Sequence, residues 1–464
     1  MKNLLTIAVA TLLLSSCALY GKYERPTDKI KTDGIIRDPL AANDTLNAEA
    51  DPNNFGQMPW RELFTDPVLQ AHIDTALKHN TDLLNAADNI KMAEAQLTVA
   101  KLAFIPSIAI APSGTISRVQ MSGAETSKTY QLPITASWNL DLFGSLMAAS
   151  RTAKMQLIAA KDYQVAVQTG IVCGVANTYY TLLMLDRQLE IVTNMEKLVK
   201  DTWDMMAMQH RLGRARSTSV QSAEANYYSV QAQAAGLRQQ IRETENAFCL
   251  LLGEAGHQVQ RTTLERQTLP SQWSTGIGLQ LLDNRADVHA AEMQLAQCFY
   301  GVKIARARFF PSINISATGM YTNSLGGSIV NPGKWITSLV GSLTQPIFAN
   351  GQLVAGLKVA KLQYDQALNT FQATVLKAGN EVSNALVAYN TSKEKSELEE
   401  KQVNVLRQNV EDTKLLYKQS SSSYLEVLSA ESQLLSAQLS KVADDFYKMQ
   451  AIVTLYQALG GGAK

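Results

Sequence analysis

The sequence predicts an α+β fold in which a module made of a helix, a pair of strands and a long helical hairpin occurs twice. An internal repeat is the first observation: Gly144 matches Gly351 at an offset of 207 residues, and Gly253 matches Gly460 at the same offset. The second is that proline is absent from two long stretches. The third is an alternation of apolar and polar residues outside those stretches. Because the unit is far longer than a solenoid repeat, it indicates a duplicated structural module.

The N-terminus has the layout of a signal peptide. Lys2 precedes an apolar run that is too short to cross a membrane and that ends in Leu14-Ser15-Ser16-Cys17. This ending resembles a bacterial lipobox, which implies removal of residues 1–16 and attachment of lipid to Cys17. An ordinary signal peptide with a coincidental cysteine is the alternative. Since no later segment reaches the roughly 20 apolar residues of a membrane helix, we expect an exported, lipid-anchored chain without a helical span.

Charge and cysteine usage exclude two classes of protein. The 42 basic and 41 acidic residues nearly cancel, so nothing indicates a nucleic-acid partner. After Cys17 the chain contains Cys173, Cys249 and Cys298. An odd number without paired spacing does not indicate a disulfide framework and is more typical of small buried residues in helices.

The two stretches without proline predict the helical hairpins. No proline lies between Pro133 and Pro270 or after Pro346, and proline inside a helix costs about 3 kcal/mol. One break interrupts each stretch, at Arg211–Arg214 and at Gln419–Ser423. The predicted helices therefore run near 145–210 and 216–252 in the first half, and near 352–417 and 424–459 in the second. A helix of that greater length extends about 100 Å, several times the thickness of a membrane.

Strands are predicted where apolar and polar residues alternate. The alternation is clearest in Tyr130–Leu140 and Ile313–Thr322 and weaker in Ser107–Val119 and Trp335–Thr344, with polar loops near 120–128 and 323–333. A transmembrane barrel and a soluble sandwich both fit this pattern. If the strands lie in lipid, four are too few, since about eight is the minimum for a barrel and open edges are not tolerated. The chain would then have to oligomerise and share one barrel.

Several short motifs follow one another in order along the mature chain. Their order, spacing and duplication are more specific than any single motif. They are Trp60, Phe64, Asp66-Pro67 and Asn80; Asn284-Arg285-Ala286-Asp287-Val288; Phe309-Phe310-Pro311-Ser312-Ile313; Gln345-Pro346-Ile347-Phe348; Tyr417 and Tyr424-Leu425-Glu426-Val427-Leu428; and Leu459-Gly460-Gly461-Gly462. With these motifs the chain resembles the TolC-like outer membrane factors, in particular the lipoprotein (NodT-type) branch that serves resistance-nodulation-division efflux systems.

The resemblance implies a homotrimeric, passive export duct in the bacterial outer membrane. Four strands from each chain would form one shared transmembrane β-barrel, and the helical hairpins would form a periplasmic α-barrel. The implied partners are outer-membrane lipid, a periplasmic adaptor (membrane fusion) protein and an inner-membrane efflux pump. Neither enzymatic activity nor a cofactor is expected. The exported substrate is not predicted, because the pump selects the cargo.

The resemblance also divides the chain into segments. We expect a signal peptide at 1–16, a lipid-anchored extended segment at 17–65, the first repeat at 66–253, a linker or equatorial belt at 254–281, the second repeat at 282–460 and a tail at 461–464.

Four residues are candidates for the pore aperture. If Glu426 faces the lumen, three-fold symmetry repeats it as an acidic ring that favours cations; a solvated surface charge is the alternative. Asp204 and Glu411, which are equivalent at the 207 offset, would add a second acidic level, and Tyr417 belongs to the same region. The chain has Ser429 where the family often carries a further acidic residue.

The hairpin tips are the second set of candidates. Small residues in Leu212-Gly213-Arg214 and Gln419-Ser420-Ser421 suit tight turns, and the resemblance makes both tips docking sites for the adaptor. This chain departs from the family at two positions, with Ser420 in place of the usual glycine and Ser422 in place of a basic residue that often latches the closed aperture.

Metal binding and catalysis find less support in the sequence. Met205, Met206, Met208 and His210 could be soft ligands for exported copper, but methionine in a coiled region more often fills the core. His72 and His79 lack a third ligand at useful spacing, so no metal site is predicted. Phosphate-binding, zinc-protease and nucleophile motifs do not occur.

Three alternatives to the small-molecule efflux duct stay open. They are the outer-membrane component of a type I secretion system, the outer-membrane component of metal-ion efflux, and a non-conducting periplasmic coiled-coil tether. A tether needs no barrel, so the alternating strands argue against it.

Overall fold

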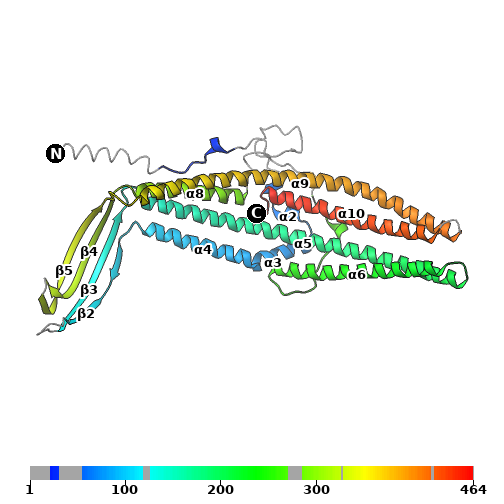
Figure 1. Ribbon diagram of the computed structural model, residues 1–464, viewed down its shortest axis with the longest axis horizontal. Helices are drawn as coiled ribbons and strands as arrows, with labels where there is room; N and C mark the ends of the chain where they lie inside the picture. Colours follow the sequence, from blue (N-terminus) through cyan, green and yellow to red (C-terminus); the bar gives the residue numbers. More distant parts are fainter. Residues whose placement is uncertain are drawn as a thin grey trace. The chain divides into compact units, whose positions relative to one another are not determined.

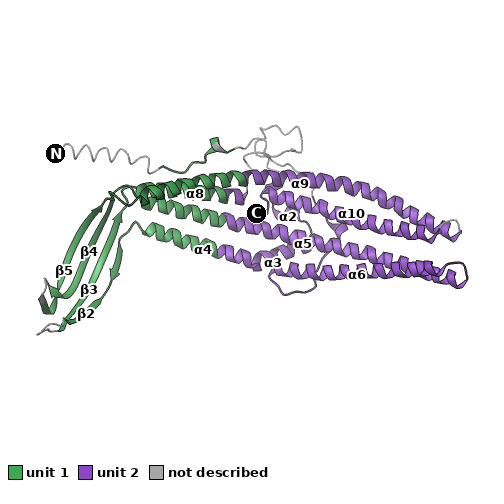
Figure 2. Ribbon diagram, viewed as in Figure 1, with its two compact units in different colours: residues 1–31, 88–161, 290–373 green, residues 32–87, 162–289, 374–464 purple. Residues whose placement is uncertain are grey.

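The computed structural model describes residues 21–30, 55–118, 126–269, 285–325, 328–419 and 423–462. The chain divides into two compact units, which Figure 2 colours separately. Unit 1 comprises the described parts of 1–31, 88–161 and 290–373, and unit 2 those of 32–87, 162–289 and 374–464. Each unit takes segments from both copies of the repeat, so the sequence repeat and the compact units do not coincide. The signal peptide and Cys17 lie outside the described residues.

The helical hairpins form where the proline distribution predicts them. Hairpin 1 consists of α5 (Ser145–Arg211) and α6 (Ser217–Leu252), and hairpin 2 consists of α9 (Gln352–Lys418) and α10 (Tyr424–Ala458). Figure 1 labels these four helices, and their ends agree with the predicted ends to within one residue. Both α5 and α9 contain 67 residues and begin 207 residues apart. The duplication is therefore confirmed element by element.

Shorter helices precede the strands in each copy. The helices α4 (Thr81–Leu102) and α8 (Ala286–Ala307) both contain 22 residues. In the first copy α2 (Trp60–Leu63) and α3 (Pro67–His79) come earlier, and Asn80 separates α3 from α4. The Asn80 side chain caps α4 by accepting hydrogen bonds from the Asp82 and Leu83 N–H groups at 2.9 and 3.3 Å. Within the described residues, no helix is both long enough and apolar enough to cross a bilayer.

Unit 1 contains one antiparallel sheet. Its strands are β1 (Ser107–Ile110), β2 (Ser113–Arg118), β3 (Thr126–Leu140), β4 (Ser312–Leu325) and β5 (Ser328–Thr344). The order is β1-β3-β4-β5, and β2 also pairs with β3 (Figure 1). Thus β1 and β2 together are the first of the four strands that the sequence predicts.

Two prolines explain why that first strand is interrupted. Pro112 lies between β1 and β2, and Pro133 lies inside β3. The Ala111 N–H donates to the Pro133 carbonyl oxygen at 3.3 Å. In an antiparallel sheet the N–H and C=O of one residue point to the same neighbouring strand. The N–H that Pro133 lacks would therefore have pointed toward the break between β1 and β2. Pro133 therefore costs the pairing between β3 and β4 nothing.

The predicted loop at 323–333 is wrong, and the predicted loop at 120–128 is too long. The strand β4 continues to Leu325 and β5 begins at Ser328, while β3 begins at Thr126; residues 119–125 lie outside the described part. A side chain supports the extension, because Asn323 accepts from the Tyr130 N–H at 2.8 Å and donates to the Lys128 carbonyl at 3.0 Å. These bonds span the irregularity between Thr322 and Ser324. Both faces of these strand ends carry polar residues, so the sequence there shows no alternation of apolar and polar residues from which a strand could be predicted.

The main core of unit 2 is aromatic. Phe64 stands edge-on to Tyr456 and tilted to Tyr180, with ring centroids 6.4 Å apart in both pairs, and all three side chains are almost fully buried. The C-terminal glycines fit against this core: a Cβ on Gly461 would overlap the ring of Tyr456. The requirement for glycine at this place accounts for part of the Leu459–Gly462 motif.

Candidate functional site

The two faces of the unit 1 sheet differ in polarity. Ile110 lies opposite Ile134, and Ile313 lies between Leu140 and Leu343 in the register, so apolar side chains are cross-strand neighbours on one face. Many of them are exposed, including Leu343 at 68%. The other face carries mostly polar residues, among them Gln131, Thr135, Ser137, Asn139, Asn314, Ser316, Thr318, Ser338 and Ser342. An exposed apolar face of this extent indicates contact with lipid or protein.

The tip of hairpin 1 is a Schellman turn. The Gly213 N–H donates to the His210 carbonyl at 2.9 Å, and the Arg214 N–H donates to the Gln209 carbonyl at 2.8 Å. Gly213 has φ of +70°, which a residue with a side chain adopts at a cost. A Cβ on Gly213 would meet no atom within 4 Å, and Leu212 is 58% exposed. The backbone of this tip is therefore open to approach.

Less of the tip of hairpin 2 is described. Gln419 is exposed and follows the end of α9, whereas Ser420, Ser421 and Ser422 lie outside the described residues. Ser423 precedes α10 in extended conformation, and its hydroxyl lies 3.3 Å from a carboxylate oxygen of Glu426.

The aperture candidates fall into two groups. Asp204, Glu411 and Glu426 are all exposed. Tyr417 is instead partly buried, and its hydroxyl donates to the Met206 sulfur at 3.4 Å. This contact joins α9 of hairpin 2 to α5 of hairpin 1. Tyr417 therefore packs between the hairpins rather than beside the three carboxylates.

A buried carboxylate that the sequence analysis did not single out also joins the hairpins. Glu431 on α10 is 1% exposed, and one of its oxygens lies 2.7 Å from the Lys414 ammonium. The same oxygen accepts a hydrogen bond from the Thr202 hydroxyl of α5 at 3.1 Å. The other carboxylate oxygen is buried without a hydrogen-bond partner among the described residues. Breaking such a pair leaves an uncompensated charge, so Lys414 and Glu431 hold α9 to α10, and the Thr202 bond connects this pair to hairpin 1. The duplicated Ala-Glu at 223–224 and 430–431 was the available signal.

Asp66 organises the connection between α3, α5 and the segment after α6. It caps α3 by accepting from the Val68 N–H, and it also accepts from Tyr179, Thr262 and Gln267, at distances between 2.5 and 2.9 Å. Burial alone would raise the pKa of Asp66, but these hydrogen bonds outweigh burial and hold the pKa below its ordinary value. The ionised carboxylate is the form that unit 2 requires.

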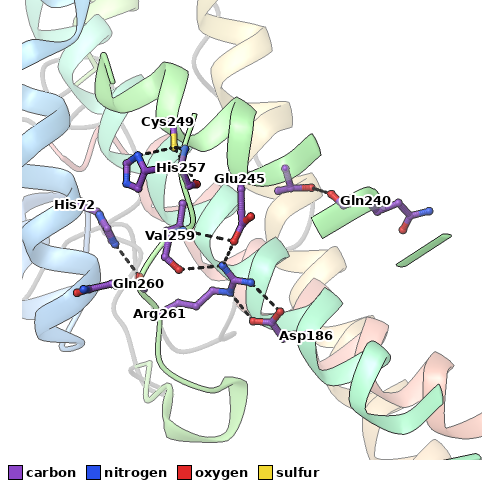
Figure 3. Close-up of polar contacts among 10 residues, drawn as sticks. His72, Asp186, Gln240, Glu245, Cys249, His257, Val259, Gln260 and Arg261 are labelled. Atoms are coloured by element: carbon purple, nitrogen blue, oxygen red, sulfur yellow. Dashed lines mark hydrogen bonds and ion pairs between the residues drawn. The ribbon is translucent and has the colours of Figure 1, made fainter. Parts of the chain in front are cut away.

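Arg261 fixes the same segment to both helices of hairpin 1. Its guanidinium binds Asp186 of α5 through two nitrogens, at 2.5 and 3.0 Å, and Glu245 of α6 at 2.6 Å (Figure 3). His72 of α3 lies 2.9 Å from the Gln260 carbonyl oxygen. Residues 257–262 therefore contact three helices, and the hydrogen bonds of Arg261 to α5 and α6 are charge-assisted, which is the stronger kind.

The candidate metal ligands do not converge. Met206 is fully buried in the cluster with Ala223 and Tyr424, whereas Met208 is 64% exposed. The Nδ1 atom of His210 lies 2.9 Å from the Ala215 carbonyl oxygen. In the part of the chain that the structure describes, no group of three or more His, Cys, Asp or Glu residues could hold a metal ion. The described cysteines are free thiols, and burial raises the pKa of Cys173 to about 12.

Replacing Asp66 by Asn should destabilise the protein in a pH-dependent way. The loss at neutral pH should be at least about 1.5 kcal/mol, the lower range for one hydrogen bond to a charged group. Because the folded pKa is lowered, the stabilisation is present above the unfolded pKa of about 3.9 and disappears as pH falls through the folded pKa. Thermal unfolding followed by circular dichroism at several pH values measures this difference.

Asp74→Asn is the matched control for Asp66→Asn. Asp74 also lies on α3, but it forms an exposed ion pair with Arg61, and such pairs contribute about 0–1 kcal/mol. Equal effects of the two substitutions, or an Asp66 effect that does not shrink in acid, would contradict the assignment.

Comparison with known proteins covers nearly the whole chain. Residues 72–254 and 278–461 each match the sequence model of a family described as outer membrane efflux protein. The two matches fall on the two copies of the repeat. The cation efflux system protein CusC of Escherichia coli (strain K12) is 26% identical over 461 residues, which covers 99% of both chains. The solvent efflux pump outer membrane protein SrpC of Pseudomonas putida is 27% identical over 461 residues, which covers 98% of this chain and 97% of SrpC.

Solved structures have the same fold. A crystal structure of CusC aligns with a TM-score of 0.81 at 26% identity, covering 91% of this chain and 99% of that one. The open state of the Neisseria gonorrhoeae MtrE outer membrane channel aligns with a TM-score of 0.80 at 26% identity, covering 96% and 98%. The chain belongs to the outer membrane efflux protein family, and it is a non-enzymatic outer-membrane channel component of an efflux system.

Proposed function

We propose that three copies of this chain form one passive exit duct for small molecules. The observation that carries the proposal is the sheet of unit 1, which has an apolar face and two edges. Among the described strands, β5 pairs only with β4, and β1 and β2 pair only with β3. In hydrocarbon each unpaired backbone group costs several kcal/mol, so further copies must supply the missing strands. Three copies of four strand positions give a twelve-stranded barrel, which exceeds the minimum of about eight.

Lipid attachment at Cys17 is part of the proposal. The described residues nearest to Cys17, 21–30, are held to unit 1, because Arg25 binds Glu292 of α8 through two nitrogens at 2.9 and 2.7 Å. The Arg151 guanidinium of α5 also donates to the Gly21 carbonyl at 3.2 Å. Four residues span at most about 14 Å, so an acyl chain on Cys17 would remain close to unit 1.

The proposed partners are a periplasmic adaptor and an inner-membrane pump. An efflux component of the outer membrane needs both, because the duct itself has no source of energy. We place the adaptor at the tips, Leu212-Gly213-Arg214 and Gln419-Ser420-Ser421. The open backbone at Gly213 and the exposure of Leu212 support this placement. The pump would choose the cargo.

The proposed aperture consists of Glu426 with Asp204 and Glu411, and Tyr417 sets the spacing of the hairpins behind it. Three-fold repetition of exposed carboxylates inside a duct would favour cations. One relative is named for cation efflux and another for solvent efflux, so members of this family serve chemically different cargoes. We therefore propose small molecules as the substrate class, without a commitment to metal ions.

The oligomer should have about three times the mass of one chain in detergent. Multi-angle light scattering measures this mass, and conductance in a planar bilayer measures the duct. A conducting monomer would rule out the shared barrel, and a conducting dimer would rule out the trimer.

An edge variant makes this test specific. The carbonyl of Pro133 points toward β1 and β2, and the direction of the backbone N–H and C=O groups alternates from one residue to the next along a strand. Followed through the register of β3, β4 and β5, this alternation points the N–H of Ser338 toward β4 and the N–H of Thr337 toward the open edge of β5. Thr337→Pro should therefore weaken the oligomer while the sheet of the single chain persists. Ser338→Pro is the matched control, because it removes a bond within the sheet and should impair folding itself.

Glu426→Gln should lower the preference of the duct for cations. The change keeps the shape of the side chain and removes three charges from the trimer, where confined water screens charge weakly. Reversal potentials under a salt gradient measure the preference. Glu397→Gln, at an exposed position of α9 far from the tip, is the control and should leave the reversal potential unchanged. An unaltered preference in Glu426→Gln would return Glu426 to the status of a surface charge.

A further inference from the structure

The seam of hairpin 1 is apolar along its middle section. Leu185, Val192, Met195 and Val199 of α5 pack against Val230, Ala234 and Leu237 of α6 in one buried cluster. Val192 is fully buried and Leu237 is 9% exposed. The α6 positions are spaced four and three residues apart, as in helices that pack side by side along a seam.

The matching section of hairpin 2 is polar. At the 207 offset, Val192 becomes Glu399 and Leu237 becomes Asp444, so two apolar partners are replaced by two carboxyl groups. A separate apolar cluster of hairpin 2 lies nearer the tip and contains Val403 and Val410 of α9 with Ala430, Leu434 and Ala437 of α10. Glu399 lies four residues before Val403, and Asp444 lies seven residues after Ala437, so both continue the seam.

The two carboxyl groups meet across the seam. Asp444 is 8% exposed, and its carboxyl group is close enough to that of Glu399 to raise the pKa of Glu399. Two carboxyl groups can share a hydrogen bond only if one of them carries a proton, because an ionised carboxylate has no donor. The Oε2 atom of Glu399 is buried without a hydrogen-bond partner in the described part of the chain. Such an atom is costly when charged.

The surrounding charges do not neutralise the pair. Burial and then the neighbouring Asp444 raise the pKa of Glu399; Lys395 opposes this effect and Asp445 adds to it. Asp445 forms an ion pair with Lys441 at 2.9 Å and accepts a hydrogen bond from the Ser396 hydroxyl at 2.5 Å.

A charged residue of hairpin 1 beside this part of hairpin 2, Arg187, is also engaged. Lys441 and Asp445 line a cavity of about 910 Å³ together with Arg187 of α5. Arg187 forms ion pairs with Glu190 and with Glu265, which follows hairpin 1 in the chain.

We propose that Glu399 and Asp444 form a proton-binding site that controls the packing of hairpin 2. With one proton bound, the pair forms a hydrogen bond and the seam closes. With the proton lost, two like charges face each other in a buried seam and separate α9 from α10 at this level. Hairpin 1, with Val192 and Leu237, has no corresponding response. The proposal rests on the fold alone and does not depend on the trimer or on the export duct.

Infrared difference spectroscopy of the full-length protein in detergent tests the site directly. Between about pH 8 and about pH 5, above the ordinary Glu pKa near 4.3, the C=O stretching band of a protonated carboxyl should appear. Glu399→Gln should abolish this band, whereas Glu400→Gln, one residue further on α9 and exposed, should retain it. A band that persists in Glu399→Gln, or one absent from the native protein, would overturn the proposal.

Hydrogen exchange tests the effect on packing. Because the folded pKa is raised, the site stabilises the seam at low pH and loses that stabilisation as pH rises through the folded pKa. After correction for intrinsic exchange rates, the protection of residues 392–403 and 437–448 from exchange should fall in the native protein as the pH is raised from about 5 to about 8. This protection should be independent of pH in Glu399→Gln and in the double variant Glu399→Val with Asp444→Leu. The double variant carries the same residue types as Val192 and Leu237 of hairpin 1 and so preserves packing. Equal pH dependence in the native protein and the double variant would also overturn the proposal.

Discussion

The need to pair every backbone group of a sheet constrains this molecule more than any other single factor. The strands of unit 1 satisfy one another internally, and even Pro133 is placed where its missing donor is not needed. The outer edges of β5 and of β1 and β2 have no partner strand among the described strands. A chain of a family that acts in the outer membrane must resolve this in a medium without water. The proposed oligomerisation would therefore be part of the fold and not an addition to it.

The duplication supplies a comparison within one chain. Helices of equal length at constant offset show that both copies obey the same packing rules. Differences at matched positions then separate shared architecture from the properties of one copy. Glu224 of hairpin 1 is partly exposed beside Tyr228, whereas its counterpart Glu431 is buried against Lys414 and Thr202. At this pair of positions, hairpin 2 is the copy that carries the buried charge.

The sequence predicts the helices well because proline and glycine act locally. Gly213 ends α5 through its own backbone conformation, so the turn can be located without knowledge of its neighbours. The strand ends at 323–333 could not be predicted, since Asn323 is held there by partners nearly 200 residues away. The same limit applies to the site. Asp66 was part of a motif, but its partners Tyr179, Thr262 and Gln267 become neighbours only in the fold.

Three carboxyl groups show how their partners decide what an acidic side chain does in this fold. Asp66 receives four hydrogen bonds from neutral donors, which favour the ionised form and fix three segments together. Glu431 has a lysine of its own hairpin, which balances its charge, and a hydroxyl of hairpin 1, which donates a hydrogen bond to it. Glu399 meets another carboxyl group, and a proton is the one partner that can join them. The first two arrangements hold helices in place near neutral pH, and only the third makes helix packing depend on pH in that range.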